Sequence, residues 1–438
     1  MKANWKEGTW TAERESGAER GARITIAADW MPLRAYESVI ADSPLAVYGD
    51  LLPLFRESDL NVVNVETTLG ASGTPHRMFG RNPQSAPPFR AAESTVRSLI
   101  EVPFHAACLA NNHILDFGAE GLERTLQTLR EAGLATVGAG MNGEEASRPL
   151  FADIGGARVA ILNCAEGEWS CSVDGGPGAN GFEILGISRQ VQALRQEADV
   201  VVVIYHGGRE YVPSPPPYIV NRLRAIADAG ASAVIAHHPH VPQGIEMYGE
   251  TPIVYSQGNF VFWQENDLYY RHTGYLVHLD IHRKRIVGMQ ITPYLIERSG
   301  LSVMRGDAKS SFLNTLQAVS GLLAQTDAIR SVWNAFIGQI GLQGMIRLLK
   351  SGMNSIESDE PRGAEQLINA FFTPAHHEFY IDGFRRVADG QLGNSPEWAK
   401  AWLHHWHQYR MDEGKQSPEQ TNAITASIEQ MRRGASGR

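Results

Sequence analysis

Seven polar side chains stand where predicted strands end, and their types suit the binding of a metal ion. They are two carboxylates, one amide and four imidazoles, carried by Asp29, Glu66, Asn112, His113, His206, His238 and His240. Ligands of open α/β sheets bind outside the carboxyl ends of the strands. Carboxylate oxygens and imidazole nitrogens suit borderline divalent ions such as Zn, Mn, Fe and Ni. We therefore predict a divalent metal site at one edge of a sheet.

The segment 108–118, CLANNHILDFG, carries the densest chemistry in the chain. It places Asn112, His113 and Asp116 between a predicted strand and a predicted amphipathic helix (118–131). An amide oxygen can bind a cation, an imidazole can move a proton, and a carboxylate can hold that imidazole in one tautomer. The alternative is a polar loop that caps the helix, because Asn and Asp favour turns.

A histidine cluster, HHPH at 237–240, directly follows the apolar run 231–236. Pro239 restricts the backbone and lets His238 and His240 point to a common centre. Packing alone is a poor explanation for three imidazoles at a strand exit, so we interpret the cluster as metal-binding.

The predicted donors outnumber the ligands that one tetrahedral catalytic ion needs. A pair of ions bridged by a carboxylate would use them all. Such a pair can hold the attacking and leaving oxygens of a displacement at phosphorus, and it lowers the pKa of bound water toward ~7. We therefore expect one or two Mn, Zn or Fe ions as cofactors.

The hydrophobic pattern predicts strands alternating with helices, and then helices only. Runs typical of strands lie at 23–28, 60–65, 102–110, 158–164, 199–205, 231–236, 251–256, 273–281 and 285–293. Helical periodicity marks 118–131, 217–229, 311–324, 328–349, 363–372, 396–409 and 418–432. We predict an α/β fold of layered sheets flanked by helices, with a flexible segment (1–22), an α/β domain (23–300) and a helical C-terminal region (301–438).

Composition excludes some classes of protein. The net charge of −9 over 438 residues does not favour a nucleic-acid partner. Three cysteines without a CxxC pair favour a reduced, cytoplasmic setting. The first 23 residues lack the apolar core of a signal peptide, and no apolar run reaches ~18 residues, so we expect no transmembrane segment.

Two other features carry weaker signals. A loop rich in Gly, Pro and Ser at 70–90 contains Arg77 and Arg81, which could face an anionic substrate. Trp398, Trp402 and Trp406 recur every four residues and share one helix face. We interpret that face as a packing surface within the chain or between chains, which leaves a homo-oligomer as a candidate assembly.

The motifs occur in a specific order. They are Asp29, NVE at 64–66, ANNH at 110–113 with Asp116 and Gly118, HGGREY at 206–211, HHPHVPQ at 237–243 and YSQGNFVF at 255–262. Together they resemble the CapA (PgsA) capsule-synthesis family, which is associated with poly-γ-glutamate and is similar to calcineurin-like metallophosphoesterases. The resemblance covers about residues 23–292 and implies a metallophosphoesterase-like fold for the α/β domain.

The resemblance also implies roles for individual residues. Metal ligands would be Asp29, Glu66 as the bridging carboxylate, Asn112, His206, His238 and His240. His113 would protonate a leaving group, and Asp116 would orient His113. We assign Arg81, His237 and Asn259 to the binding of an anionic small-molecule or polymer substrate.

Three functional hypotheses remain open at this level. The first is a metal-dependent phosphoester hydrolase, linked to poly-γ-glutamate or capsule polymer metabolism. The second is a metal-dependent enzyme that forms or cleaves a glutamyl-type amide, because Met31 stands where the phosphoesterases usually have a histidine. The third is a non-catalytic assembly subunit that docks through the tryptophan face.

Overall fold

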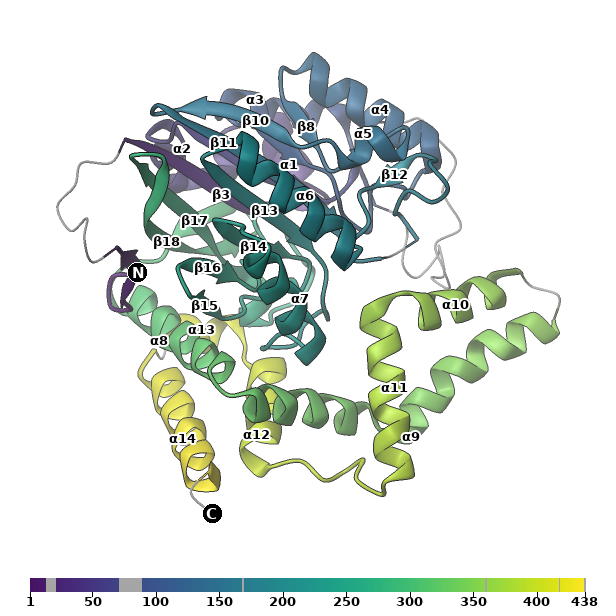
Figure 1. Cartoon of the computed structure of the whole chain (residues 1–438). Helices are drawn as coiled ribbons and strands as arrows, with labels where there is room; N and C mark the ends of the chain where they lie inside the picture. The colour runs from purple at the N-terminus through teal and green to yellow at the C-terminus, as the bar shows by residue number, and fades with distance from the viewer. Residues whose placement is uncertain (13–20, 71–88, 168, 359–360, 417, 437–438) are drawn as a thin grey trace.

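A computed structural model describes residues 1–12, 21–70, 89–167, 169–358, 361–416 and 418–436 (Figure 1). Among these residues, two large sheets form the body of the molecule. No described helix combines the length and the apolar character that crossing a membrane requires.

The first sheet has the strand order β1-β2-β18-β17-β3-β4-β7-β8, and β19 pairs with β18. Strands β3, β4, β7 and β8 run parallel, whereas β17 is antiparallel to β3. The bounds are β1 (Lys2–Asn4), β2 (Thr9–Thr11), β3 (Ala22–Trp30), β4 (Leu60–Val65), β7 (Ala106–Cys108), β8 (Ala135–Val137), β17 (Thr273–His282), β18 (Arg285–Glu297) and β19 (Gly300–Val303).

The second sheet has the order β10-β11-β13-β14-β16-β15, and its four central strands run parallel. Its strands are β10 (Leu150–Ile154), β11 (Ala157–Ala165), β13 (Val200–His206), β14 (Ala233–His237), β15 (Ile245–Tyr248) and β16 (Thr251–Val254). Two small pairs complete the described strands: β5 (Thr68–Leu69) with β6 (Arg90–Ala91), and β9 (Ala139–Gly140) with β12 (Gly178–Ala179).

The two sheets pack face to face because side chains alternate along each strand. Ile24, Ile26 and Val62 join one core with the second sheet, while Ala27 and Val63 face a second core on the opposite side. That second core includes residues of α1 (Ala35–Asp42), α2 (Leu52–Arg56), α3 (Arg97–Glu101) and α4 (Gly118–Glu131). Helices α6 (Ile184–Glu197) and α7 (Pro217–Asp228) cover the second sheet (Figure 1). The predicted α/β fold of layered sheets flanked by helices is confirmed.

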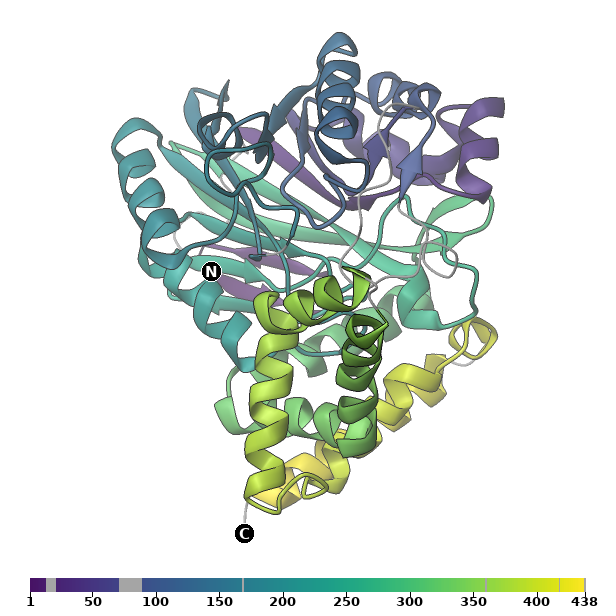
Figure 2. The same ribbon diagram turned by 90° about the vertical axis from the view of Figure 1, so that its right-hand side faces the viewer.

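Helices follow the last strand. They are α8 (Gly306–Leu323), α9 (Thr326–Glu357), α10 (Pro361–Phe372), α11 (Pro374–Ala388), α12 (Glu397–Gln408), α13 (Met411–Gln416) and α14 (Pro418–Ser436). Helix α9 is kinked at Gly341, whose φ is 68°. Figure 1 and Figure 2 show α10 and α11 beside α9, and all three helices pack on one another. Val332, Trp333 and Trp402 belong to the same core as the second sheet, so these helices do not form an isolated unit.

The tryptophan face of α12 packs within the chain. Trp398, Trp402 and Trp406 are all buried, and the Trp406 ring stacks on Tyr270 with centroids 3.7 Å apart. The third hypothesis therefore loses its docking surface, because this face is buried within the chain, where α12 packs against α9 and α14 and Trp406 lies on Tyr270.

The structure corrects several predictions. Within the predicted flexible segment 1–22, β1 and β2 extend the first sheet and Trp10 is buried, while residues 13–20 lie outside the described residues. The predicted strand 102–110 is a strand only at Ala106–Cys108. Sequence reasoning missed α6 and α11, and the first sheet continues past residue 300 through β19.

Candidate metal centre

Two overlapping sets of buried donors meet where the carboxyl ends of strands from both sheets come together. One set is Asp29, Glu66 and His206, and the other is Glu66, His238 and His240. In each set, one ligand atom per residue lies within 4.8 Å of the others. Asp29 and Glu66 come from the first sheet and the histidines from the second. Glu66 belongs to both sets.

Short distances connect these donors. His206 Nε2 lies 3.3 Å from Glu66 Oε1 and 2.9 Å from Asn112 Oδ1. His240 Nδ1 lies 3.5 Å from Asp29 Oδ2, and His240 Nε2 lies 3.8 Å from Glu66 Oε1. The predicted ligands Asp29, Glu66, Asn112, His206 and His240 thus converge on one centre, with His238 beside them.

Several buried donor atoms in this centre accept no hydrogen bond. They are Asp29 Oδ2, both carboxylate oxygens of Glu66 and His238 Nδ1. A buried carboxylate oxygen that accepts no hydrogen bond is costly unless a cation lies beside it. The donor set therefore fits a divalent cation held by oxygen and nitrogen ligands.

The backbone is strained at the two histidines of the second set, His238 and His240. His238 has φ 100° and His240 has φ 56°, and side chains other than glycine rarely adopt such values. The strain lies directly after β14, around Pro239, and it brings the two imidazole centroids to 5.9 Å. Such strain persists only where the surrounding structure fixes it, and it is concentrated at functional sites.

The surroundings of the centre shift the pKa values of its imidazoles in opposite directions. Burial lowers the pKa of His238 to about 3, and burial also lowers the pKa of His206 well below its ordinary value. Burial acts against the charge on His240 too, but Glu66 and Asp29 outweigh it and raise the pKa of His240 to about 9. Burial and the charge of Asp29 raise the pKa of Glu66. At neutral pH His206 and His238 are therefore ready to bind a cation, whereas His240 carries a proton between two carboxyl groups.

His113 and Asp116 form a buried acid–base pair near this centre. His113 Nδ1 lies 2.9 Å from Asp116 Oδ2, which also accepts a hydrogen bond from the Phe89 amide at 2.7 Å. The His113 amide donates to Asn111 Oδ1. With Nδ1 held by the carboxylate, Nε2 is the nitrogen that can exchange a proton.

The predicted substrate-binding residues have different positions. His237 Nε2 lies 2.8 Å from Gln257 Oε1, and Asn259 Oδ1 lies 2.9 Å from His240 Nδ1. Both side chains are fully buried and bond to residues of the chain, which suits positioning of the imidazoles, and their contact with substrate stays a prediction. Arg81 and its neighbour Arg77 lie outside the described residues.

Sequence reasoning missed three polar residues around the centre. Asn64 donates to Asp29 Oδ1 at 2.7 Å, and it lies on the same side of the chain as Glu66 because strand side chains alternate. Glu166, directly after β11, accepts a hydrogen bond from the Gly208 amide. The charge of Glu210 acts on Glu66 and His238. The signal for Asn64 was a polar residue within an apolar run. The signal for Glu166 was a carboxylate directly after a strand.

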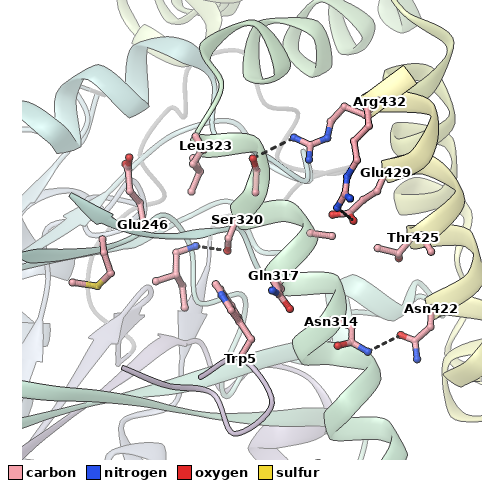
Figure 3. A pocket seen from close by; sticks show the side chains of 17 residues that line it. Trp5, Glu246, Asn314, Gln317, Ser320, Leu323, Asn422, Thr425, Glu429 and Arg432 are labelled. Atoms are coloured by element: carbon pink, nitrogen blue, oxygen red, sulfur yellow. Dashed lines mark hydrogen bonds and ion pairs between the residues drawn. The ribbon is translucent and has the colours of Figure 1, made fainter. Parts of the chain in front are cut away.

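A separate groove of about 770 Å³ lies between α8 and α14 (Figure 3). Ser320 and Glu246 line it, together with Arg432 from α14. None of the metal-donor residues lines this groove, and Glu246 is already paired with Arg224. The groove is therefore distinct from the candidate metal centre.

Residues 23–264, more than half of the chain, match the family model described as "Bacterial capsule synthesis protein PGA_cap". The chain belongs to the PGA_cap family. The predicted resemblance to the CapA proteins is thereby confirmed. The match contains every donor of the centre, whereas α8 to α14 lie outside it.

The curated relatives match this chain over only part of their own length. "Capsule biosynthesis protein CapA" of Bacillus anthracis is 36% identical over 180 residues, which are 40% of this chain and 44% of the relative. "PGA biosynthesis protein CapA" of Bacillus subtilis (strain 168) is 31% identical over 225 residues, 50% of this chain and 57% of the relative. The chain thus spans about half the length of these curated relatives.

Among solved structures, one described as a novel phosphatase from Mycoplasma pneumoniae has a TM-score of 0.40 and 12% identity. The comparison covers 63% of this chain and 93% of that chain.

Proposed function

We propose that this chain is a metal-dependent hydrolase of phosphoester type that acts at a one- or two-metal centre. The observation that carries the proposal is Glu66, a buried carboxylate shared by two donor sets and without a hydrogen bond on either oxygen. Asp29 and His206 would complete one set, and His238 and His240 the other. Asn112 adjoins the first set through His206.

The residues of the chain supply binding and proton transfer. A bound divalent ion (Mn, Zn or Fe) would lower the pKa of water toward ~7 and make hydroxide available at neutral pH. His113 would donate a proton from Nε2 to the leaving oxygen, and Asp116 would keep His113 in the required tautomer. The strained turn at His238 and His240 would hold two donors in place before substrate arrives.

Our proposal for the cellular role rests on the names of the relatives. We infer that the substrate is an anionic small molecule or polymer, linked to poly-γ-glutamate or capsule polymer metabolism. The three cysteines are free and buried, which supports the predicted reduced cytoplasmic setting. A homo-oligomer stays a prediction.

The test combines metal content with turnover. We expect chain purified without chelator to contain Mn, Zn or Fe by elemental analysis and to hydrolyse a generic aryl phosphate. His113→Ala should lower kcat by about 10²- to 10⁴-fold with unchanged metal content, because it removes the proton donor but no ligand. His404→Ala is the matched control, since His404 is an exposed histidine of α12. Full metal occupancy without turnover of any ester would contradict the proposal.

One observation favours the amide hypothesis as a second candidate. Met31 is fully buried two residues after Asp29, at a place where the phosphoesterases usually have a histidine, so the first donor set lacks an imidazole there. A centre altered in this way could serve the formation or cleavage of a glutamyl-type amide. Product analysis with aryl phosphate and γ-glutamyl amide substrates side by side separates the two candidates, and a preference for phosphate esters alone rules out the second.

A further inference from the structure

Tyr211 lies against the candidate metal centre in a strained backbone conformation. Its φ is 62°, its amide donates to the Pro239 carbonyl at 2.9 Å, and its ring centroid lies 5.8 Å from that of His240. Tyr211 therefore faces a turn that is itself strained at His238 and His240. Three strained residues in contact need strong outside support.

Contacts from other parts of the chain supply that support. His407 Nε2 donates to the Tyr211 carbonyl at 2.8 Å, and Arg271 lies 3.7 Å above the Tyr211 ring. Gln264 donates to the Tyr211 hydroxyl at 3.4 Å. Burial lowers the pKa of His407, which keeps that imidazole neutral with its single N–H available for the carbonyl.

His407 belongs to α12, and α12 packs against the segment Tyr269–His272, which precedes β17. Trp406 stacks on Tyr270, and the Tyr269 amide donates to the Tyr409 carbonyl at 2.9 Å. The same segment reaches His240 from the other side, because Asn259 contacts both the Arg271 carbonyl and His240 Nδ1. Two neighbours of His240, Tyr211 and Asn259, are thus linked by contacts to α12, a helix outside the family match.

We propose that α12, through the hydrogen bond from His407 to Tyr211, positions His240 in the metal centre, so that the helical C-terminal region is a working part of the site. His407 is a positioning residue in this account, since it touches neither donor set. The metal-dependent part of the proposal rests on the proposed function, whereas the loop geometry does not.

The experiment uses three variants of the full chain. His407→Phe keeps the ring but removes the donor, His407→Gln restores a donor, and His404→Ala changes an exposed histidine of the same helix. Two readouts are the affinity for Mn²⁺ by titration calorimetry and the visible spectrum of the Co²⁺-loaded chain. A third is amide hydrogen exchange over residues 208–212 in the presence of chelator, with β11 as the internal reference. Should His407→Phe not fold, His407→Asn, whose amide is too short to reach the carbonyl, takes its place.

We expect His407→Phe to weaken Mn²⁺ binding about tenfold, to alter the Co²⁺ spectrum and to speed exchange at the Tyr211 amide. His407→Gln should restore all three, and His404→Ala should match the unchanged chain. Unchanged exchange and spectrum in His407→Phe would overturn the proposal. If the unchanged chain takes up neither Mn²⁺ nor Co²⁺, the proposed metal centre fails, and the exchange data alone then decide the positioning of Tyr211.

Discussion

At the scale of single residues, His240 is the donor whose pKa its charged neighbours affect most clearly. His240 lies 3.5 Å from Asp29 and 3.8 Å from Glu66, and these neighbours raise its pKa to about 9 against the opposing effect of burial. The proton on His240 thus occupies the place in the charge balance that a divalent cation would take.

This charge balance predicts a pH-dependent affinity for metal. A histidine ligand must be neutral, so below a pKa of about 9 His240 has to release its proton when a cation binds. The apparent affinity should therefore fall as the pH is lowered, by up to about tenfold per pH unit for one proton.

Titration calorimetry with Mn²⁺ in two buffers of different ionisation enthalpy measures the protons released at pH 7. We expect a release close to one proton per chain in excess of that from the remaining ligands. An affinity that does not change between pH 6 and pH 8 would show that His240 does not ligate.

At the scale of elements, β13 ends in the donor His206, and the tight loop that follows is held by Glu166, the residue directly after β11. Glu166 accepts hydrogen bonds from the Gly208 amide at 2.5 Å and from the Tyr218 hydroxyl at 2.8 Å. A Cβ at Gly207 would lie 2.5 Å from the Glu166 Cβ, so the loop and the carboxylate fit together only because residue 207 is glycine. The loop that continues from His206 to Tyr211 is therefore fixed from the strand β11.

The prediction at this scale is that Glu166→Ala destabilises the fold and loosens the site. Three donors, the Gly208 amide, the Tyr218 hydroxyl and the Arg222 guanidinium, would lose this acceptor, which costs about 1–3 kcal/mol for each buried donor left without one. Urea unfolding should show the loss, and Mn²⁺ affinity should fall with it. Glu197→Ala, an exposed glutamate on α6, is the control and should leave both unchanged.

At the scale of the whole molecule, the C-terminal helices complete the core of the α/β layers. Trp402 on α12 and Trp333 on α9 belong to the same buried cluster as Val203 and Ile235 of the second sheet. This continuity explains why α12 can reach the metal-centre loops. Because the core is shared, we expect the α/β layers and the C-terminal helices to unfold together.

Trp402→Ala should therefore lower the free energy of unfolding of the whole chain by about 3–5 kcal/mol, the usual cost of truncating a buried aromatic ring. Circular dichroism and intrinsic fluorescence should report one shared, earlier unfolding transition. Phe371→Ala is the control, since Phe371 is exposed on α10 and its loss should cost under about 0.5 kcal/mol. Two separate transitions in Trp402→Ala, with the α/β layers unaffected, would contradict a shared core.

The sequence alone determined the α/β layers and the donor types at the strand ends, because local hydrophobic periodicity and the chemistry of side chains need no long-range information. Helix α4 begins and ends at the predicted residues for the same reason. Segments whose structure depends on distant partners were predicted wrongly. Residues 9–11 form β2 by pairing with the distant strand β18, and residues 2–4 form β1 by pairing with β2. Only the tertiary structure decided that Glu66 is shared by two donor sets, that Asn259 stands behind His240 and that α12 returns to hold Tyr211. These facts depend on contacts between residues up to about two hundred positions apart, and pairing at that distance is set by the packing of the whole core.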